Sequence, residues 1–453
     1  GGQTALGLAR GLEENGVPIL GTSPAQIDAA EERGKFSEIL KVSNLKAPEN
    51  DIAFDNESAF KVAQEIGFPV LVRPSFVLGG RGMEIIYDEQ GMSSYFDRNK
   101  GNVVIDSEHP LLVDRFLDDA IEIDVDALYD GQRLFIGGIM EHIEEAGIHS
   151  GDSSCTLPPV TLSDGVVQQV RKATHDIAEA IGVRGLINIQ FALSAGGLFV
   201  LEANPRASRT VPFVSKALGI TLAKAASLIM VGKSIEDLIR SGHLPEVDGG
   251  QAPDSPISVK EAVLPFRRFT TPEGKYVDSL LGPEMRSTGE VMGIAEDFPK
   301  AFAKSQVAAG VKLPKTGKVF VSVSDRDKHQ IVLPIRRLWQ MGFEILATSG
   351  TAKILGRQGI PTTEVTKFSE KSEGERSIVE MIADGEIDIV INTPSGGAAR
   401  ADGYEIRAAT TASGKAIFTT TAQLAPAIAS LEFIRESPFE VKSLQDYDRQ
   451  RVR

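Results

Sequence analysis

A single cysteine, Cys155, occurs among the 453 residues, and the sequence has no long uncharged hydrophobic run. One cysteine excludes an intrachain disulfide, and no secretory signal opens the chain, so we expect a cytoplasmic protein. The longest apolar stretch, residues 220–231, is broken by Lys224 and is shorter than the roughly 18 residues of a membrane span. The sequence therefore predicts no disulfide and no membrane segment.

Three familiar site motifs are also missing. No Gly-x-Gly-x-x-Gly fingerprint occurs, and Gly232-Lys233-Ser234 lacks the earlier glycine of a Walker A loop because that position is Ser227. His142 has no second histidine four residues away, which excludes a helical zinc motif.

Acidic side chains are in excess, with 62 Asp and Glu against 48 Lys and Arg, for a net charge of −14. Residues 313–453 hold 19 basic and 18 acidic side chains, so the excess lies in the first 312 residues. An acidic body disfavours nucleic acid and anionic membranes as partners and suits substrates that arrive with divalent cations. The near-neutral tail is expected to be a separate unit, and the length predicts about three domains.

The beginning of the chain is abrupt. A helical pattern at Leu6, Ala9 and Leu12 stops at Gly16, and a strand is predicted at residues 17–20. Because no initiator methionine and no first strand precede this helix, we expect a piece of a longer protein that starts inside an α/β unit.

Strand and helix patterns change along the chain. Residues 57–204 are rich in strands, residues 241–256 are rich in Gly, Pro and Asp, and strands alternate with helices from residue 318. That alternation predicts a parallel sheet with ligands at the carboxyl ends of its strands. Thr348-Ser349-Gly350-Thr351 and residues 392–397 are suited there to holding a phosphate, with simple helix capping as the alternative.

A predicted hairpin carries the most informative residues. If its turn centres on Gly196, Gln190 lies opposite Glu202, and Asn204 lies on the same face as Glu202. One carboxylate and two amide oxygens are hard ligands suited to Mg²⁺, and Arg206 and Arg209 follow as candidates to hold a phosphoryl group. The alternative is a surface ion pair between Glu202 and Arg206.

Two further segments carry candidate side chains. In the predicted strand at residues 121–129, Asp124 and Asp126 are expected to be solvated, whereas Glu122 follows a loop and is suited to accept the hydroxyls of a ribose. In the pliable loop at residues 147–154, His149 is a candidate donor to a phosphoryl oxygen, with a structural hydrogen bond as the alternative. Arg73 ends a strand before a glycine-rich cover at residues 79–82.

Five blocks of sequence together resemble the carboxyl-terminal half of the large subunit of carbamoyl-phosphate synthases. The blocks are RPS at 73–75, FLDDAIE at 116–122, GGIMEHIE at 137–144, HSGDS at 149–153 and EANPR at 202–206. The resemblance covers nearly the whole chain and implies an α/β and α+β fold class, namely an ATP-grasp fold followed by a doubly wound, methylglyoxal-synthase-like regulatory domain. The expected units are a truncated α/β domain (1–36), the ATP-grasp domain (37–240), a linker and connecting region (241–312) and the regulatory domain (313–453).

The resemblance also implies an activity, the phosphorylation of carbamate by ATP to give carbamoyl phosphate and ADP for arginine and pyrimidine biosynthesis. Matching positions imply ATP binding by Arg73, Arg115, Leu117, Glu122, Gly147, Ile148, His149, Ser150, Gln190 and Glu202. Mg²⁺ or Mn²⁺ is expected at Gln190, Glu202 and Asn204, with K⁺ as a further candidate ion, and Arg206, Arg209 and His149 at the phosphoryl-transfer centre.

Regulatory positions follow from the same resemblance. A nucleotide monophosphate, UMP or IMP, is expected at Lys328, Thr348, Thr351, Lys367 and Asn392, and ornithine at Glu144, Asp152, Glu261 and Thr420. Pro394 departs from the family, where a bacterial relative has a threonine, which leaves the identity of the effector open.

The expected partners are the missing amino-terminal synthetase half and a glutaminase small subunit, in an oligomer. Two alternatives stay open at this stage. The first alternative is that the chain is another ATP-grasp ligase. The second is that it is a non-catalytic regulatory and assembly piece of the same synthase.

Overall fold

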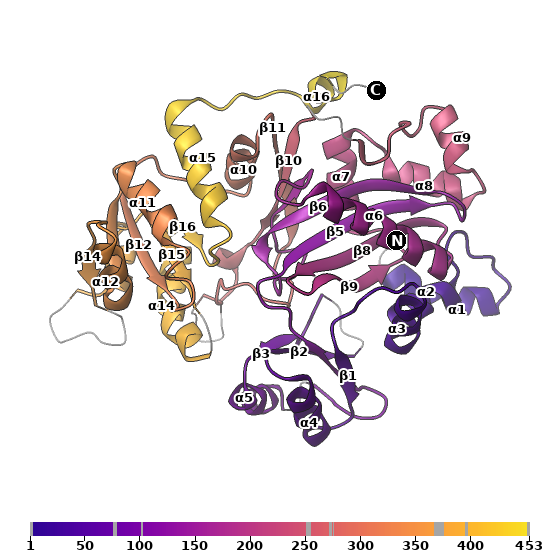
Figure 1. The fold of residues 1–453 in the computed structure, drawn as a ribbon, viewed down its shortest axis with the longest axis horizontal. Helices are drawn as coiled ribbons and strands as arrows, with labels where there is room; N and C mark the ends of the chain where they lie inside the picture. The colour runs from indigo at the N-terminus through magenta and orange to yellow at the C-terminus, as the bar shows by residue number, and fades with distance from the viewer. Residues whose placement is uncertain are drawn as a thin grey trace.

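Within the described part of the chain, the strands form three sheets of four, seven and five strands (Figure 1). The computed structural model describes residues 3–75, 79–100, 103–250, 255–270, 274, 276–366, 376–394 and 397–450. In the view of Figure 1 the five-stranded sheet lies to the left, the seven-stranded sheet to the right and the four-stranded sheet below.

Three helices precede the first strand. They are α1 (Gln3–Glu14), α2 (Pro24–Glu31) and α3 (Arg33–Val42). The predicted helix is present, but the strand predicted at residues 17–20 is wrong, because these residues form no ladder with any described strand. Val17 and Leu20 are 45% and 63% exposed, so a local apolar run without a neighbouring strand does not become sheet.

The four-stranded antiparallel sheet forms a small lobe with two helices. Its elements are β1 (Asn50–Ala53), α4 (Asn56–Ile66), β2 (Val70–Pro74), β3 (Glu84–Ile86), α5 (Glu89–Asn99) and β4 (Leu111–Arg115), with strand order β1-β4-β2-β3. Inward side chains such as Val72 and Val113 pack on Ala59 and Tyr95 of the helices, which gives the lobe its own core.

The seven-stranded sheet is antiparallel and lies beside the small lobe. Its strands are β5 (Ile121–Tyr129), β6 (Leu134–Glu145), β7 (Cys155–Leu157), β8 (Gly185–Ser194), β9 (Gly197–Asn204), β10 (Ile257–Val263) and β11 (Gly289–Ala295), in the order β11-β10-β7-β6-β5-β8-β9. Helix α6 (Asp164–Ile181) covers the apolar face, where it packs on Ile123, Val125 and Ile189. Part of the opposite face is covered by α7 (Val211–Leu218), α8 (Leu222–Met230) and α9 (Ile235–Arg240).

The segment expected to be a linker and connecting region, residues 241–312, contributes two of these strands. β10 and β11 pair with each other, and β10 continues the sheet through β7. The segment also contains η1 (Asp248–Gly250), η2 (Phe266–Arg268) and α10 (Phe298–Ala308). The pairing of β10 with a strand about 100 residues earlier has no local signal in the sequence.

The five-stranded sheet is parallel and has helices on both faces, as the alternation of patterns predicts. Its elements are β12 (Lys318–Val323), α11 (Val332–Gln340), β13 (Glu344–Thr348), α12 (Ser349–Arg357), β14 (Thr363–Val365), α13 (Ile378–Ala383), β15 (Ile389–Thr393), α14 (Gly397–Ser413), β16 (Ala416–Phe418) and α15 (Leu424–Glu436). The helix α16 (Leu444–Gln450) lies instead beside β11, where the Tyr447 hydroxyl donates to the Ile294 carbonyl (Figure 1). The strand order is β14-β13-β12-β15-β16. Val319 and Val321 point to one core, and Phe320 and Val390 point to the other.

The core on one face of the five-stranded sheet continues into the seven-stranded sheet. Val259 of β10 and Phe302 of α10 belong to the same buried cluster as Val321. Within the described residues no single helix has both the length and the hydropathy to span a membrane, and only α7 and α8 pass that test as a pair, bent by 114°.

Candidate functional site

One face of the seven-stranded sheet carries polar side chains on three adjacent strands. Residues directly opposite in an antiparallel ladder point to the same face, so the register of β5, β8 and β9 forms two polar rows. The rows are Asp124, Gln190 and Glu202, and Asp126, Asn188 and Asn204. The alternating residues of the same strands are the apolar ones that pack on α6. A single sheet thus has a hydrophobic face toward α6 and a polar face on its other side.

The predicted pairing of Gln190 with Glu202 is confirmed, although the hairpin reaches it by a different route. Ser194 pairs with Gly197, so the turn is tighter than predicted, and a bulge at Leu201 restores the expected register by residue 202. Asn188 then pairs with Asn204, which places Asn204 on the face of Glu202 as predicted.

Arginines from both lobes meet at Glu202. Asn204 Nδ2 donates to Glu202 Oε1 at 2.7 Å, and an Arg206 guanidinium nitrogen donates to Asn204 Oδ1 at 3.1 Å. The ion pair of Glu202 is formed with Arg73 of the small lobe, at 3.6 Å, rather than with Arg206. Arg73 also lies 3.4 Å from Asp114, so this one cation joins the two lobes at the polar rows.

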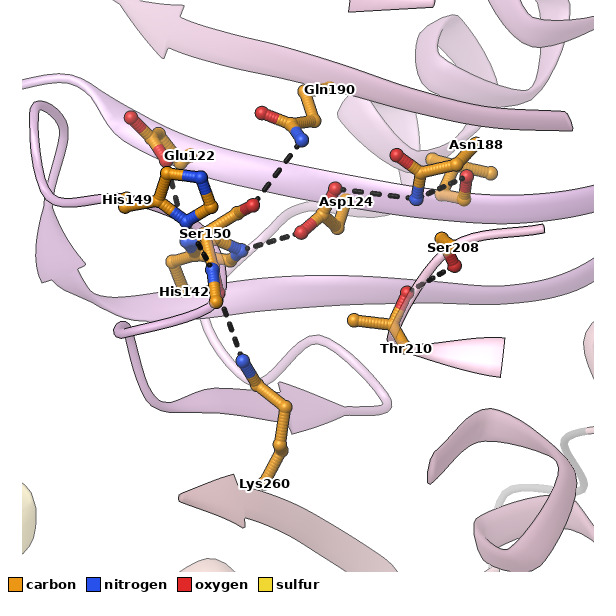
Figure 2. Close-up of polar contacts among 12 residues, drawn as sticks. Glu122, Asp124, His142, His149, Ser150, Asn188, Gln190, Ser208, Thr210 and Lys260 are labelled. Atoms are coloured by element: carbon orange, nitrogen blue, oxygen red, sulfur yellow. Dashed lines mark hydrogen bonds and ion pairs between the residues drawn. The ribbon is translucent and has the colours of Figure 1, made fainter. Parts of the chain in front are cut away.

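The donor set fits a hard divalent cation. Among the described residues no group of three or more His, Cys, Asp or Glu side chains is placed to hold a metal, so a site here depends on the carboxylate of Glu202 and the amide oxygens of Gln190 and Asn204. The amide nitrogen of Gln190 donates to Ser150 Oγ at 3.3 Å, and its oxygen points away from that contact (Figure 2). Oxygen ligands of this kind are those that Mg²⁺ prefers.

Glu122 lies two residues before Asp124 on β5, and it is anchored by a buried histidine. Its Oε1 accepts from the Gly147 amide at 3.1 Å, and its Oε2 lies 3.4 Å from His142 Nδ1 (Figure 2). His142 Nε2 lies 3.0 Å from Asp124 Oδ2. Burial alone lowers the pKa of His142, but hydrogen bonds to Asp124 and Glu122 raise it to about 9, so the ring is an imidazolium between two carboxylates.

The expectation that Asp124 and Asp126 are solvated is wrong. Their residues are 3% and 0% exposed. Asp126 accepts hydrogen bonds from Ser208, Thr210 and Asn188, and burial raises its pKa to about 6 against the lowering effect of these donors. The loop after β9 folds back over Asp126, and His142 of β6 bonds Asp124, contacts that no local sequence pattern contains.

The loop at residues 147–154 lies against the polar rows and is held from two sides. Lys260 of β10, 1% exposed, donates to the Ser150 carbonyl at 2.9 Å (Figure 2). The Gly151 amide lies 3.0 Å from His149 Nδ1, which makes that nitrogen the acceptor and leaves Nε2 as the donor of a neutral ring. Burial lowers the pKa of His149, which favours this neutral form.

The remaining residues that were expected to bind the nucleotide lie at three different places in the structure. Arg115 donates to the carbonyls of Ile66 and Gly67, so its side chain caps the end of α4 instead of joining the polar rows. Leu117 is half-buried in the segment that joins the small lobe to β5. Gly147 and Ile148 line a cavity of about 80 Å³, whose further lining includes Phe116, Asp118, Arg326, Thr393 and Thr420.

Arg206 and Arg209 follow β9 on one short loop. Arg209 Nε lies 3.9 Å from Glu290 of β11, and its guanidinium also contacts Met285. The side chain of Arg209 remains 42% exposed. The two arginines are therefore available beside the row that contains Glu202 and Asn204.

Two of the four positions expected to bind ornithine lie together. Ser154 Oγ is 2.9 Å from Glu144 Oε1 and 2.7 Å from Glu261 Oε2, and burial followed by the charge of Glu144 raises the pKa of Glu261 to about 8. Asp152 instead accepts from the backbone amides of residues 286 and 287. Thr420 has a buried hydroxyl without a hydrogen-bond partner and lines the cavity.

The expected nucleotide-monophosphate positions gather at the carboxyl ends of parallel strands. Thr348 ends β13, Asn392 lies in β15, and Thr351 in the first turn of α12 has a buried hydroxyl that finds no hydrogen-bond partner among the described residues. A Cβ on Gly350 would lie 2.9 Å from Lys328 Nζ, so this amine stands over the start of α12. Lys367 lies outside the described residues.

Some residues at the site carry no clear signal in the sequence. Lys260 is one of them, because β10 was not recognised as part of the sheet. Arg407 is another: it is fully buried, and its guanidinium donates twice to Asp278 at 2.7 Å and once to Asn392 at 2.9 Å. A single arginine in a helix has no pattern that distinguishes it from a surface residue.

Comparison with known sequences gives two family matches. Residues 32–238 match the model described as "Carbamoyl-phosphate synthase L chain, ATP binding domain", and residues 330–415 match the model described as "MGS-like domain". The carbamoyl phosphate synthase large chain of Clavibacter sepedonicus is 66% identical over 450 residues, which cover 99% of this chain and 41% of that protein. The large chain of Beutenbergia cavernae is 59% identical, covering all of this chain and 41% of that protein. The chain thus spans about two fifths of the length of these relatives.

Solved structures match the fold at low sequence identity. The biotin carboxylase domain of Hydrogenobacter thermophilus 2-oxoglutarate carboxylase, in complex with MgADP and bicarbonate, is 17% identical with a TM-score of 0.51 over 67% of this chain and 70% of that chain. Rhizobium etli pyruvate carboxylase is 14% identical with a TM-score of 0.52 over 68% of this chain and 30% of that one. These likenesses concern the fold alone, which is the ATP-grasp fold followed by the parallel MGS-like sheet.

Proposed function

Because the chain belongs to the family of carbamoyl phosphate synthase large chains and matches their carboxyl-terminal half, we propose that it phosphorylates carbamate with ATP to give carbamoyl phosphate and ADP. The observation that carries this proposal is the polar row of Gln190 and Glu202, with Asn204 and Arg206 beside it and Arg73 reaching it from the small lobe. The row brings cations and hard oxygen donors together between two lobes, which is what the transfer of a phosphoryl group requires.

The side chains divide the work between binding and charge stabilisation. Glu122, fixed by His142 and the Gly147 amide, is placed to accept ribose hydroxyls. Arg206 and Arg209 bind the transferring phosphoryl group, and neutral His149 donates from Nε2 to one of its oxygens. The loop at residues 147–154 excludes water that would hydrolyse carbamate, and no side-chain nucleophile takes part because the carbamate oxygen attacks directly.

Gln190, Glu202 and Asn204 would hold Mg²⁺ or Mn²⁺, which when bound neutralises phosphate charge and orients the nucleotide. K⁺ is a further candidate ion, without an assigned set of ligands. Arg115, Leu117 and Ile148 are proposed nucleotide residues by their position around the lobe junction. For Arg115 this requires that its guanidinium leave the carbonyls at the end of α4.

The parallel sheet is proposed to bind a regulatory nucleotide monophosphate, UMP or IMP. The support is the position of Lys328, Thr348 and Thr351 at the start of α12, where backbone amides and the helix dipole favour a phosphate. Lys367 and Asn392 complete the proposed set, although Asn392 is engaged by Arg407. Ornithine is proposed at Glu144, Glu261, Thr420 and Asp152, although the Asp152 carboxylate is engaged by the backbone amides of residues 286 and 287.

The remainder of the large chain, which carries the amino-terminal synthetase half, is proposed as a partner, together with a glutaminase small subunit in an oligomer. The proposed units are residues 1–36, 37–240, 241–312 and 313–453. In this division the third unit, with β10 and Lys260, completes the catalytic sheet rather than only connecting two domains.

The test is the reverse reaction, in which the chain is incubated with MgADP and carbamoyl phosphate and ATP is measured. We expect the wild type to synthesise ATP and Glu202→Ala to lose about a hundredfold or more of this activity. The reason is that the loss of a metal-ligand carboxylate costs several kcal/mol of transition-state stabilisation. Glu236→Ala is the matched control, since Glu236 of α9 forms an exposed ion pair with Arg133. Background activity in wild type and Glu202→Ala alike would contradict the catalytic proposal and favour a regulatory and assembly role.

A further inference from the structure

The loop that carries the two arginines has two kinds of residue with opposite orientations. At residues 205–210 the arginines Arg206 and Arg209 are half-buried or exposed, whereas Thr210 is buried at 6% exposure. Ser208 and Thr210 turn their hydroxyls toward β5, and the two hydroxyls lie 2.8 Å apart (Figure 2). The loop is therefore tied to the sheet by hydroxyls, while Arg206 lies beside Asn204 and the side chain of Arg209 stays 42% exposed.

Both hydroxyls donate hydrogen bonds to one buried carboxylate. Asp126 Oδ1 accepts from Ser208 Oγ at 2.7 Å and from Asn188 Nδ2 at 3.0 Å, and Asp126 Oδ2 accepts from Thr210 Oγ1 at 2.6 Å. Asp126 is completely buried, and these three hydrogen-bond donors are neutral. A carboxylate in such a place depends on its hydrogen-bond donors for compensation, so it holds them strongly and in a fixed direction.

Thr210 gives up a local role for this contact. It occupies the position just before α7, where a threonine side chain ordinarily accepts from an amide of the first turn, but here it makes no such cap. Its hydroxyl is donated to Asp126 instead. A residue that forgoes its own helix cap to reach a distant carboxylate indicates that the position of the loop, and not the helix end, is what the contact secures.

The guanidinium groups have few other restraints. Arg206 contacts Asn204 Oδ1 and the Ala207 carbonyl, both within three residues of its own position. Arg209 contacts the neutral sulfur of Met285, and its ion pair with Glu290 is long at 3.9 Å. The direction in which both side chains leave the backbone is therefore set by the backbone of the loop. Asp126 fixes that backbone at Ser208 and Thr210, on either side of Arg209.

We propose that Asp126 is a positioning residue for phosphoryl transfer, which acts by anchoring the loop at residues 205–210 through Ser208 and Thr210 so that Arg206 and Arg209 face the transferring phosphate. This rests on the proposed function and extends it to a residue that touches neither nucleotide nor metal in the arrangement described above. A displacement of about 1 Å in groups that act on the transition state lowers turnover by as much as a hundredfold.

The test compares two isosteric substitutions of buried threonines. Thr210→Val removes the anchoring hydroxyl, Thr210→Ser keeps it, and Thr174→Val is the matched control, because Thr174 is fully buried on α6 and donates only to the Val170 carbonyl in its own helix. In the ATP-synthesis assay we expect Thr210→Val to lower kcat by roughly tenfold to a hundredfold and to raise KM for carbamoyl phosphate. KM for ADP should stay within about twofold, because the ribose contact at Glu122 is unchanged.

Thr210→Ser should recover most of the lost kcat, and Asp126→Asn and Ser208→Ala should reproduce the pattern of Thr210→Val. Thr174→Val is expected to lower the melting temperature but to leave kcat and both KM values unchanged. If Thr210→Val keeps the kcat and KM values of Thr174→Val, the positioning role is contradicted while the proposed function stands.

A second measurement tests the anchoring of the loop without an activity assay. Amide hydrogen exchange at residues 206–211 should be about tenfold faster or more in Thr210→Val than in Thr174→Val, because the loop loses its anchor. Equal exchange rates in the two variants would overturn the inference. Absence of ATP synthesis in the wild type would overturn the proposed function instead, and the exchange comparison would still test the anchoring of the loop.

Discussion

The seven-stranded and five-stranded sheets place their candidate functional residues in opposite ways. In the antiparallel sheet the side chains stand inside the strands, on alternate positions such as Gln190 and Asn188. In the parallel sheet they lie where the strands end, as Thr348 and Thr351 do after β13. A site inside strands depends on register, because a slip of one residue turns every side chain to the other face, whereas a site beyond strand ends depends on the strand order and on the loops.

The difference has a consequence for substitutions. Changes in the antiparallel face should act on catalysis, since that face forms the proposed phosphoryl-transfer site. Changes in the parallel sheet should act on stability or on the response to an effector. The following predictions test this division, beginning with the largest effect.

The first prediction concerns the register of β9. Deleting Ala203 would bring Asn204 opposite Ile189, on the face that packs on α6, and would turn it away from Glu202. We expect ATP synthesis to fall by at least a hundredfold, because a metal ligand is lost and an unpartnered amide is buried at a cost of roughly 1–3 kcal/mol.

Deleting Leu201 provides the matched control. Leu201 is the extra residue of the bulge, so its removal leaves Glu202 opposite Gln190 and Asn204 opposite Asn188. We expect this variant to keep ATP synthesis within about tenfold of the wild type, because the polar rows keep their register. If the two deletions reduce activity equally, the register of the strand is not what determines the site.

The second prediction concerns stability in the parallel sheet. Arg407→Met should lower the free energy of unfolding by roughly 3 kcal/mol, because it breaks the ion pair that a fully buried arginine forms with Asp278 and removes its hydrogen bond to Asn392. Urea denaturation followed by circular dichroism measures the loss. Arg337→Met is the control, since the pair of Arg337 with Glu432 is more than one third exposed and should contribute about 1 kcal/mol or less. Similar losses in both variants would contradict the importance of burial.

How much of this could be predicted from the sequence depends on the distance between partners along the chain. The pair of Gln190 and Glu202 is predictable because a short hairpin fixes its register locally. Asp126 was expected to be solvated because its partners Ser208 and Thr210 lie 82 and 84 residues away. Arg407 meets Asp278 across 129 residues, and β10 finds its neighbour across about a hundred, so neither contact has a local signal.

The lack of distant partners in a local pattern also explains why some predicted residues do not lie at the polar rows. The resemblance implies a nucleotide role for Arg115, but its guanidinium donates hydrogen bonds to the carbonyls at the end of α4. These carbonyls have no partner within the helix, so the contact is required by the small lobe itself. The strand expected at residues 17–20 failed because propensity without a pairing edge does not form a ladder. Local patterns therefore predict elements well, and they predict sites only where one element supplies the whole site.

The third prediction is a pH dependence that arises on the antiparallel face. The folded-state pKa of His142 is about 9, above the ordinary value of 6.5, because Asp124 and Glu122 hold its proton. The corresponding stabilisation is complete below pH 6.5 and is lost as the pH rises through 9, for a total of roughly 3 kcal/mol. In His142→Gln the fall in unfolding free energy between pH 6.5 and 10, measured with urea, should be smaller than in the wild type by about that amount. Equal falls would show that the ring is not held as an imidazolium.

The last and smallest effect is expected at the nucleotide end of the parallel sheet. Saturating UMP, at about a hundred times its Kd, should stabilise the chain against heat by about 2.7 kcal/mol, and Thr351→Ala should remove roughly 1 kcal/mol of this protection. Without nucleotide the same variant should be slightly more stable than the wild type, because it removes a buried hydroxyl that has no hydrogen-bond partner. Thr362→Ala, at a hydroxyl that bonds only to the Ile360 carbonyl, should leave the protection unchanged. Equal protection in the wild type and Thr351→Ala would contradict this site, whereas opposite signs with and without nucleotide are a result that a purely structural threonine would not give.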